Sequence, residues 1–341
     1  MRTRNIFAKS FAIALIVIAA TNCEDPFDIT EPQSSNQNQA QLFMKIAEGS
    51  GSLTSFTPNY NESEALAMAG ILGKNLYPVH IQQKMTLVDK NLILAKDSTS
   101  AVGTLVQNYE GKLIIQGSFQ PPTIGIRTRT DTTIQKTFST TITRLIHFKK
   151  VANTGNDTLD WKVNAISLPY GGTDGNNIQI VKLTLTSQNG TPVEITDPGL
   201  FLFKIGKEKK HDRDDEDDDN DEFEENHFNW KYNWKDLKTW YKKNQKVNLR
   251  IEVLSNISDP DFLTVTYGAM MNGVPGKKAK FDIVSTVQDG SSFRKVYELN
   301  FYTNANAVRM HAVINAYTRN SVYDTESAVE SKSWGIPYRV K

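Results

Sequence analysis

The sequence predicts a mainly β protein made of tandem antiparallel β-sandwich domains, with one or two short helices near its N-terminus. Many short segments rich in Val, Ile, Leu and Thr follow one another at close spacing. Turn signals containing Gly, Asn and Asp separate them, and no long helical pattern lies between them. The chain has a single cysteine, so no disulfide can form within it and each domain must be stabilised by its own apolar core.

The first residues of the chain have the pattern of an export signal. Arg2, Arg4 and Lys9 precede an uncharged apolar run at 11–20. This run is about ten residues long, which suits a signal sequence and is too short to span a bilayer as a helix. The only cysteine of the protein, Cys23, follows after Thr21 and Asn22.

This arrangement resembles the signal of a bacterial lipoprotein, in which a peptidase cuts before a cysteine that then carries lipid. The family motif prefers Leu, then Ala or Ser, then Gly or Ala before that cysteine, where this chain has Ala20, Thr21 and Asn22. The resemblance implies removal of residues 1–22 and a lipid anchor on Cys23. Two alternatives stay open: a secretory signal cut near Ala20, and an uncleaved N-terminal anchor.

The unpaired thiol favours the lipoprotein, because acylation accounts for an odd cysteine in an exported chain. Several acyl chains on one residue also anchor a protein stably. The next residues, Glu24 and Asp25, resemble a signal that sends some lipoproteins to the outer face of the outer membrane. We therefore expect an outer-membrane lipoprotein that is exposed at the surface.

The segment after the signal is polar before the first helical pattern begins. Residues 25–39 are rich in Pro, Ser, Asn and Gln, which is typical of a flexible tether. Apolar residues at helical spacing predict a helix over 39–48, and Asn61 and Gly73 bound a second one over 62–72.

Strands are expected in the rest of the chain, apart from an acidic interruption after 204. The longer predicted strands are 80–95, 101–108, 112–119, 132–143, 159–166, 178–186, 247–254, 262–267, 279–287, 293–302 and 308–317. Turns are predicted between them, including one at 109–111. Trp161 lies in a predicted strand and is the kind of residue around which a sandwich core packs.

These elements predict a division of the chain into six parts. In order they are the signal peptide (1–22), the flexible tether (23–40), a helix plus β domain (41–120), a β-sandwich domain (121–205), an acidic disordered segment (206–227) and a C-terminal β-sandwich domain (228–341). The last part resembles an immunoglobulin-like sandwich without its disulfide, in its strand pattern alone.

The acidic segment is the strongest charge feature of the sequence. Residues 212–225 contain eleven of the 38 acidic residues and a single base, so the remainder is mildly basic. We interpret it as a solvated, self-repelling loop without a cofactor. The alternative is weak Ca²⁺ binding, because this ion takes six to eight oxygen ligands. The candidate ligands are Asp214, Glu216, Asp218 and Glu225, although an EF-hand loop would need Gly where Asp219 stands.

An aromatic stripe follows the acidic segment. Trp230, Tyr232 and Trp234 alternate with Asn and Lys, and Trp240 lies just beyond. Such a row could form a platform on which sugar rings stack. The same row could be a core-facing strand, since aromatic side chains contribute large burial energies.

No catalytic motif is present: the sequence lacks GxSxG, HExxH, a P-loop and a GxGxxG after a strand. The sequence therefore favours a membrane-anchored surface lipoprotein with a non-enzymatic binding or structural role. The alternative is a carbohydrate-binding accessory protein or glycoside hydrolase, whose paired carboxylates need geometry and no sequence motif. Polysaccharide or a surface protein is the expected partner, and nucleic acid is not, because an exported protein seldom meets it.

Overall fold

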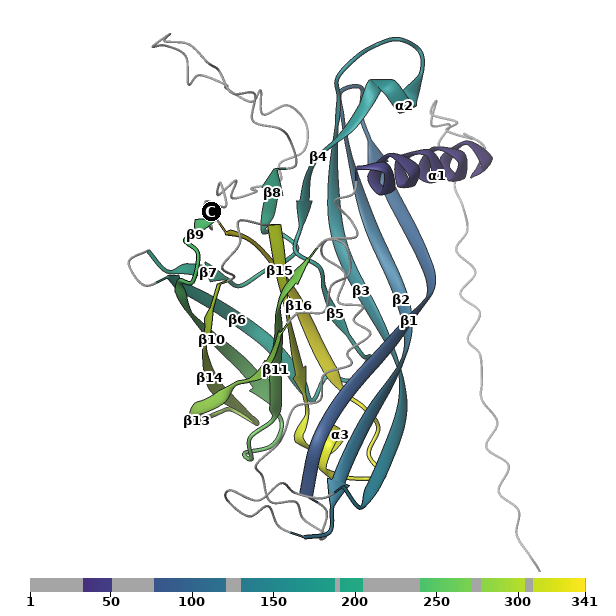
Figure 1. Ribbon diagram of the computed structural model, residues 1–341. Coiled ribbons are helices and arrows are strands. Elements are labelled where there is room, and N and C mark those ends of the chain that lie inside the picture. The colour runs from purple at the N-terminus through teal and green to yellow at the C-terminus, as the bar shows by residue number, and fades with distance from the viewer. Residues whose placement is uncertain are drawn as a thin grey trace, which may run out of the picture.

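The chain folds as a mainly β protein with antiparallel sheets, which confirms the predicted fold class (Figure 1). The structure is a computed structural model that describes residues 33–50, 77–120, 130–187, 191–204, 240–270, 277–303 and 309–340. Within these residues there are two sheets and three helices, which are α1 (Gln33–Gly49), α2 (Asp157–Asp160) and α3 (Arg319–Tyr323). The predicted second helix at 62–72 lies outside the described residues.

The larger sheet has eleven strands in the described part of the chain. Its path is β1-β2-β3-β5-β16-β15-β11-β12, while β4 pairs with β3 and β8, and β9 pairs with β16. The strands are β1 (Tyr77–Lys96), β2 (Ser100–Ser118), β3 (Thr132–Lys150), β4 (Trp161–Ser167), β5 (Tyr170–Gly172), β8 (Leu202–Lys204), β9 (Trp240–Tyr241), β11 (Phe262–Met270), β12 (Lys277–Lys280), β15 (Arg309–Tyr317) and β16 (Ser331–Val340).

The smaller sheet runs in the order β13-β14-β10-β6-β7. Its strands are β6 (Ile178–Ser187), β7 (Val193–Ile195), β10 (Lys246–Ser255), β13 (Asp282–Asp289) and β14 (Ser292–Tyr302). Both sheets combine strands from different predicted domains. For example, β6 of the predicted domain 121–205 pairs with β10 of the predicted domain 228–341. That these domains fold separately stays a prediction.

The two sheets enclose the main apolar core. Buried side chains of β6, β10 and β14 pack against those of β11, β15 and β16. The central strand β10 shows why: Val247, Leu249, Ile251 and Val253 alternate with polar residues and are all fully buried. This alternation places one apolar face against the opposite sheet, which is the packing that defines a β-sandwich.

The long strands β1, β2 and β3 form a meander beside the sandwich, and helices cover one face of it. Helix α1 packs Phe43 and Ala47 against the end of the meander where β3 stops. Phe43 lies edge-on to Phe148 at 4.8 Å between ring centroids and 5.2 Å from Trp161. Trp161 is buried as the sequence predicts, although it packs beneath a helix and not between two sheets.

Helix α3 and the segment that follows it cover the other half of the meander (Figure 1). Val322 and Val329 join a second apolar cluster with Phe138 and Ile142 of β3. Helices α1 and α3 therefore lie towards opposite ends of β1, β2 and β3.

Several predicted boundaries are wrong. The predicted turn at 109–111 does not exist, because β2 continues through it and pairs with β3 over its whole length. The segment predicted as one strand at 279–287 is divided into β12 and β13 at the buried Phe281. Helix α1 begins at Gln33, so it includes residues that the sequence assigns to the tether. The helix α3 and the strand β16 correspond to no predicted element.

Tertiary contacts explain why the glycine signal at 111 misleads. A side-chain carbon on Gly111 would lie 2.3 Å from Cζ of Phe138, so the ring occupies the space above the glycine. A glycine inside a strand often marks such a close approach. Another chain segment also approaches Gly171 of β5 closely: an added carbon there would lie 1.9 Å from the carbonyl oxygen of Thr141. This close approach lets β5 join the meander to the sandwich.

The free energy of unfolding is expected to decrease as the pH is lowered, because of His147 on β3. Burial lowers the pKa of His147 to about 4, whereas histidine in an unfolded chain titrates near 6.5. Below about pH 6.5 the unfolded chain gains a proton that the folded chain excludes, so about 2 kcal/mol of stability should be lost by about pH 5. Urea unfolding at the two pH values measures this loss. His147→Gln should remove that part of the slope, and an equal loss in both proteins would contradict the prediction.

Candidate functional site

Most of the site residues predicted from sequence lie outside the described residues. These are the lipid-attachment candidate Cys23, the Ca²⁺ candidates Asp214, Glu216, Asp218 and Glu225, and the aromatic residues Trp230, Tyr232 and Trp234. Trp240 opens β9, whose backbone pairs in parallel with β16. The cation site and the sugar platform therefore stay predictions.

The candidate site in the described structure is a polar pocket at one end of the sandwich. It lies where β6 and β16 begin and where β10 and β15 end, so loops of both sheets meet there. Its volume is about 240 Å³. The polar lining comes from four separate segments and consists of Asn177, Asn256, Thr318, Asn320, Ser327 and Glu330. Ile257 and Ala328 supply apolar surface.

A chain of hydrogen bonds connects one wall of the pocket. The side-chain amide of Asn177 donates to Oε1 of Glu330 at 2.6 Å, and its backbone N–H donates to Oε2 at 3.3 Å. The side-chain amide of Asn256 in turn donates to Oδ1 of Asn177 at 2.6 Å. These bonds link the carboxylate of Glu330 to two carboxamides at the exposed surface of the protein.

A second set of hydrogen bonds holds the start of α3 beside Glu330. The backbone N–H of Thr318 donates to the carbonyl of Glu330 at 3.0 Å. The buried hydroxyl of Ser321 accepts from the backbone N–H of Glu330 at 2.7 Å and lies 2.7 Å from the hydroxyl of Thr318. Thr318 also caps the helix, because its side chain accepts from the backbone N–H of Ser321.

Lys136 of β3 fastens the segment between α3 and β16 to the meander. Its buried Nζ donates to the carbonyl oxygens of Ser321 at 2.9 Å and Ser327 at 2.8 Å, and also to that of Asp324. Burial lowers the pKa of Lys136, while the nearby charges of Asp324 and Glu326 oppose this shift. One ammonium group therefore satisfies three carbonyls in a segment that lines the pocket.

A fully buried ion pair fastens α3 to the sandwich. Nζ of Lys295 on β14 lies 2.7 Å from Oδ2 of Asp261, and both side chains are 0% exposed. The other oxygen of Asp261 accepts from the backbone N–H of Arg319, the first residue of α3, at 3.1 Å. Burial raises the pKa of Asp261, and the Lys295 ammonium works against that rise. The pocket is thus built on a rigid base that involves both sheets.

The chemistry of the pocket is that of hydrogen bonding to a polar ligand. Carboxamides both donate and accept, hydroxyls do the same, and an ionised carboxylate only accepts. Among the described residues that line the pocket, Glu330 is the one with a charged side chain. Glycoside hydrolysis uses a pair of carboxyl groups, and the described lining supplies one of them, that of Glu330.

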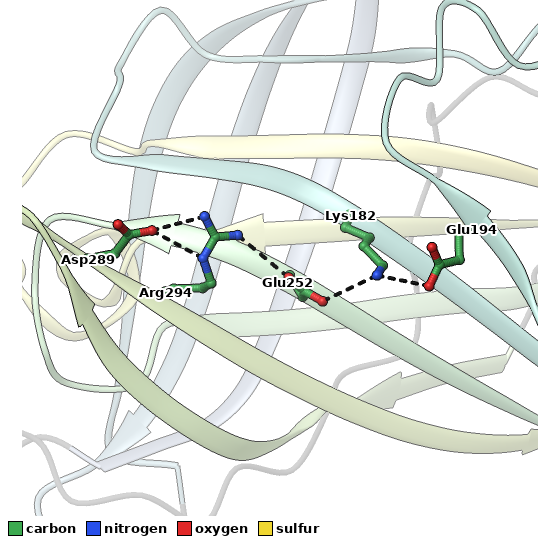
Figure 2. Close-up of polar contacts among 5 residues, drawn as sticks. All are labelled: Lys182, Glu194, Glu252, Asp289 and Arg294. Atoms are coloured by element: carbon green, nitrogen blue, oxygen red, sulfur yellow. Dashed lines mark hydrogen bonds and ion pairs between the residues drawn. The ribbon is translucent and has the colours of Figure 1, made fainter.

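A row of alternating charges crosses the outer face of the smaller sheet (Figure 2). Asp289 lies 2.9 Å from Arg294, which lies 3.6 Å from Glu252; Glu252 lies 3.8 Å from Lys182, which lies 2.9 Å from Glu194. All five side chains are partly or largely exposed. Cross-strand pairs of this kind support the register of a sheet. We interpret the row as a solvated face that supports the fold.

No protein-family model, curated protein or solved structure matches this chain. Across the described ranges, no helix is both long and apolar enough to span a membrane. The same ranges contain no group of three or more His, Cys, Asp or Glu side chains placed to hold a metal ion.

No pattern in the sequence identifies the pocket residues. Asn177 and Glu330 are 153 positions apart yet share two hydrogen bonds. Each is an ordinary polar residue beside a strand end, and no spacing pattern links them. Only the pairing of the strands brings the four segments together.

Proposed function

We propose that this protein is an exported lipoprotein, anchored in the outer membrane by lipid on Cys23, with a non-enzymatic binding role at the surface. The sequence supports the anchor through the basic start, the apolar run and the single cysteine that follows it. The structure supports the binding role through one observation: a polar pocket formed by four loops at one end of a rigid sandwich.

The position of α1 also fits this proposal. Helix α1 begins at Gln33 and packs against one end of the meander, while α3 and the pocket segment that follows it pack on its other half (Figure 1). The ten Cα–Cα steps from Cys23 to Gln33 could reach about 35 Å at most. An anchor on Cys23 would therefore hold the α1 end near the membrane and leave the pocket loops on the part farther from it.

Metabolic labelling with a fatty-acid analogue tests the anchor. The wild-type protein should take up the label and partition with outer membranes, and Cys23→Ser should lose both properties. Protease treatment of intact cells should digest the wild-type protein if it faces outward. Mass spectrometry that finds an unmodified Cys23, or a mature chain that begins at Thr21, would rule the anchor out.

A further inference from the structure

We propose that the polar pocket binds a single neutral sugar unit, free or at the end of a glycan chain. The inference deepens the binding role proposed above by naming the class of ligand. It depends on the size of the pocket, on the groups that line it, on its charge and on its rigidity.

The size of the pocket suits about one sugar ring. Its volume of about 240 Å³ corresponds to roughly eight waters of liquid volume. Pockets for drug-sized molecules occupy about 300–1,000 Å³. A monosaccharide unit is the kind of polar molecule that such a space can hold.

The lining offers donors and acceptors side by side. A sugar hydroxyl both donates and accepts, and so does a carboxamide. The side chain of Asn320 makes no hydrogen bond to any residue within the described ranges, so both ends of its amide are available. The hydroxyl of Ser327 donates to Asp324 and can still accept. Ile257 and Ala328 can contact the C–H surface of a ring.

The charge of the lining selects against acidic ligands. Glu330 contributes one negative charge, and none of the described residues that line the pocket has a cationic side chain. Both oxygens of this carboxylate accept from Asn177, yet each can accept one more bond. An acidic sugar would meet a like charge and a neutral sugar would not.

The rigid base of the pocket reduces the cost of binding. Lys136, the Asp261–Lys295 pair and Ser321 already hold α3 and the lining segment that follows it in place. A ligand that meets a preorganised site loses less of its binding energy to ordering loops. Because the ligand is small, we expect a dissociation constant of about a millimolar.

The test is saturation-transfer NMR and calorimetry on the mature full-length chain with glucose, galactose, mannose, N-acetylglucosamine and glucuronic acid. At least one neutral sugar should bind, and glucuronic acid should bind more weakly. Asn320→Ala should weaken binding by about tenfold or more, because it removes a donor and an acceptor from the pocket. The matched control is Asn91→Ala, which changes an exposed asparagine on β1 and should leave binding unchanged. Circular dichroism verifies that both variants fold.

A disaccharide that ends in the neutral sugar that binds distinguishes a free sugar from a sugar at the end of a glycan chain. Retained binding assigns the pocket to glycan ends, and lost binding assigns it to the free sugar. The proposal is overturned if no neutral sugar binds at about ten millimolar, if Asn320→Ala binds as the wild type does, or if glucuronic acid binds more tightly. Labelling of Cys23 is measured separately, so a failure here leaves the anchor proposal untouched.

Discussion

Replacing Lys295 with Met is expected to lower the free energy of unfolding by about 3–5 kcal/mol. The substitution leaves the carboxylate of Asp261 buried without its counter-charge, and both side chains are fully buried in the native protein. Removing one partner of such a pair costs far more than an isolated surface ion pair contributes. Urea unfolding monitored by circular dichroism measures the change.

Two further variants make this result specific. Lys90→Met breaks an ion pair with Glu48 whose side chains are each 43% exposed, and should cost less than about 1 kcal/mol. The double variant Lys295→Met with Asp261→Asn should recover part of the loss, because it removes the buried charge and keeps an acceptor for the N–H of Arg319. Equal decreases in the free energy of unfolding for Lys295→Met and Lys90→Met would show that the buried ion pair contributes no more than the exposed one.

Truncating Phe43 to Ala should lower the free energy of unfolding by about 3–5 kcal/mol, the usual cost of removing a buried aromatic side chain. Phe43 is fully buried and packs against Phe148 and Trp161. The ammonium of Lys96 also lies 5.6 Å from the centroid of its ring. Thermal unfolding measures the loss, and limited proteolysis reports whether α1 has detached from the meander.

Lys45→Ala is the matched control on the same helix, because Lys45 is exposed. It should leave both the unfolding curve and the proteolysis pattern nearly unchanged. If Phe43→Ala behaves like Lys45→Ala, the contact of α1 with β3 and β4 contributes little to stability.

Some features of the fold could be predicted because they depend on neighbouring residues. The alternation from Val247 to Val253 identifies a half-buried strand without reference to the rest of the chain. The turn at Asp289–Gly290 likewise stands between β13 and β14, and Gly290 has the positive φ of 61° that such turns use. Local pattern therefore located most of the strands.

Other features failed because distant residues decide them. In the sequence, Gly111 predicts a turn. In the structure, the ring of Phe138 leaves no space for a side chain at this position of β2. The pocket could not be predicted for the same reason: its lining comes from four loops without a shared motif. The predicted anchor, cation site and aromatic platform lie outside the described residues and stay predictions.

By itself the sequence determined that this protein is mainly β, that most of its strands pair antiparallel at close spacing, and that no disulfide can form within the chain. These properties follow from side-chain periodicity and turn chemistry, which act over a few residues. The tertiary structure alone decided that β5 joins the meander to the sandwich, that β6 pairs with β10, and that Asn177 meets Glu330. The order and register of strand pairing depend on how side chains from distant parts of the sequence pack together. Short-range sequence patterns do not determine that packing.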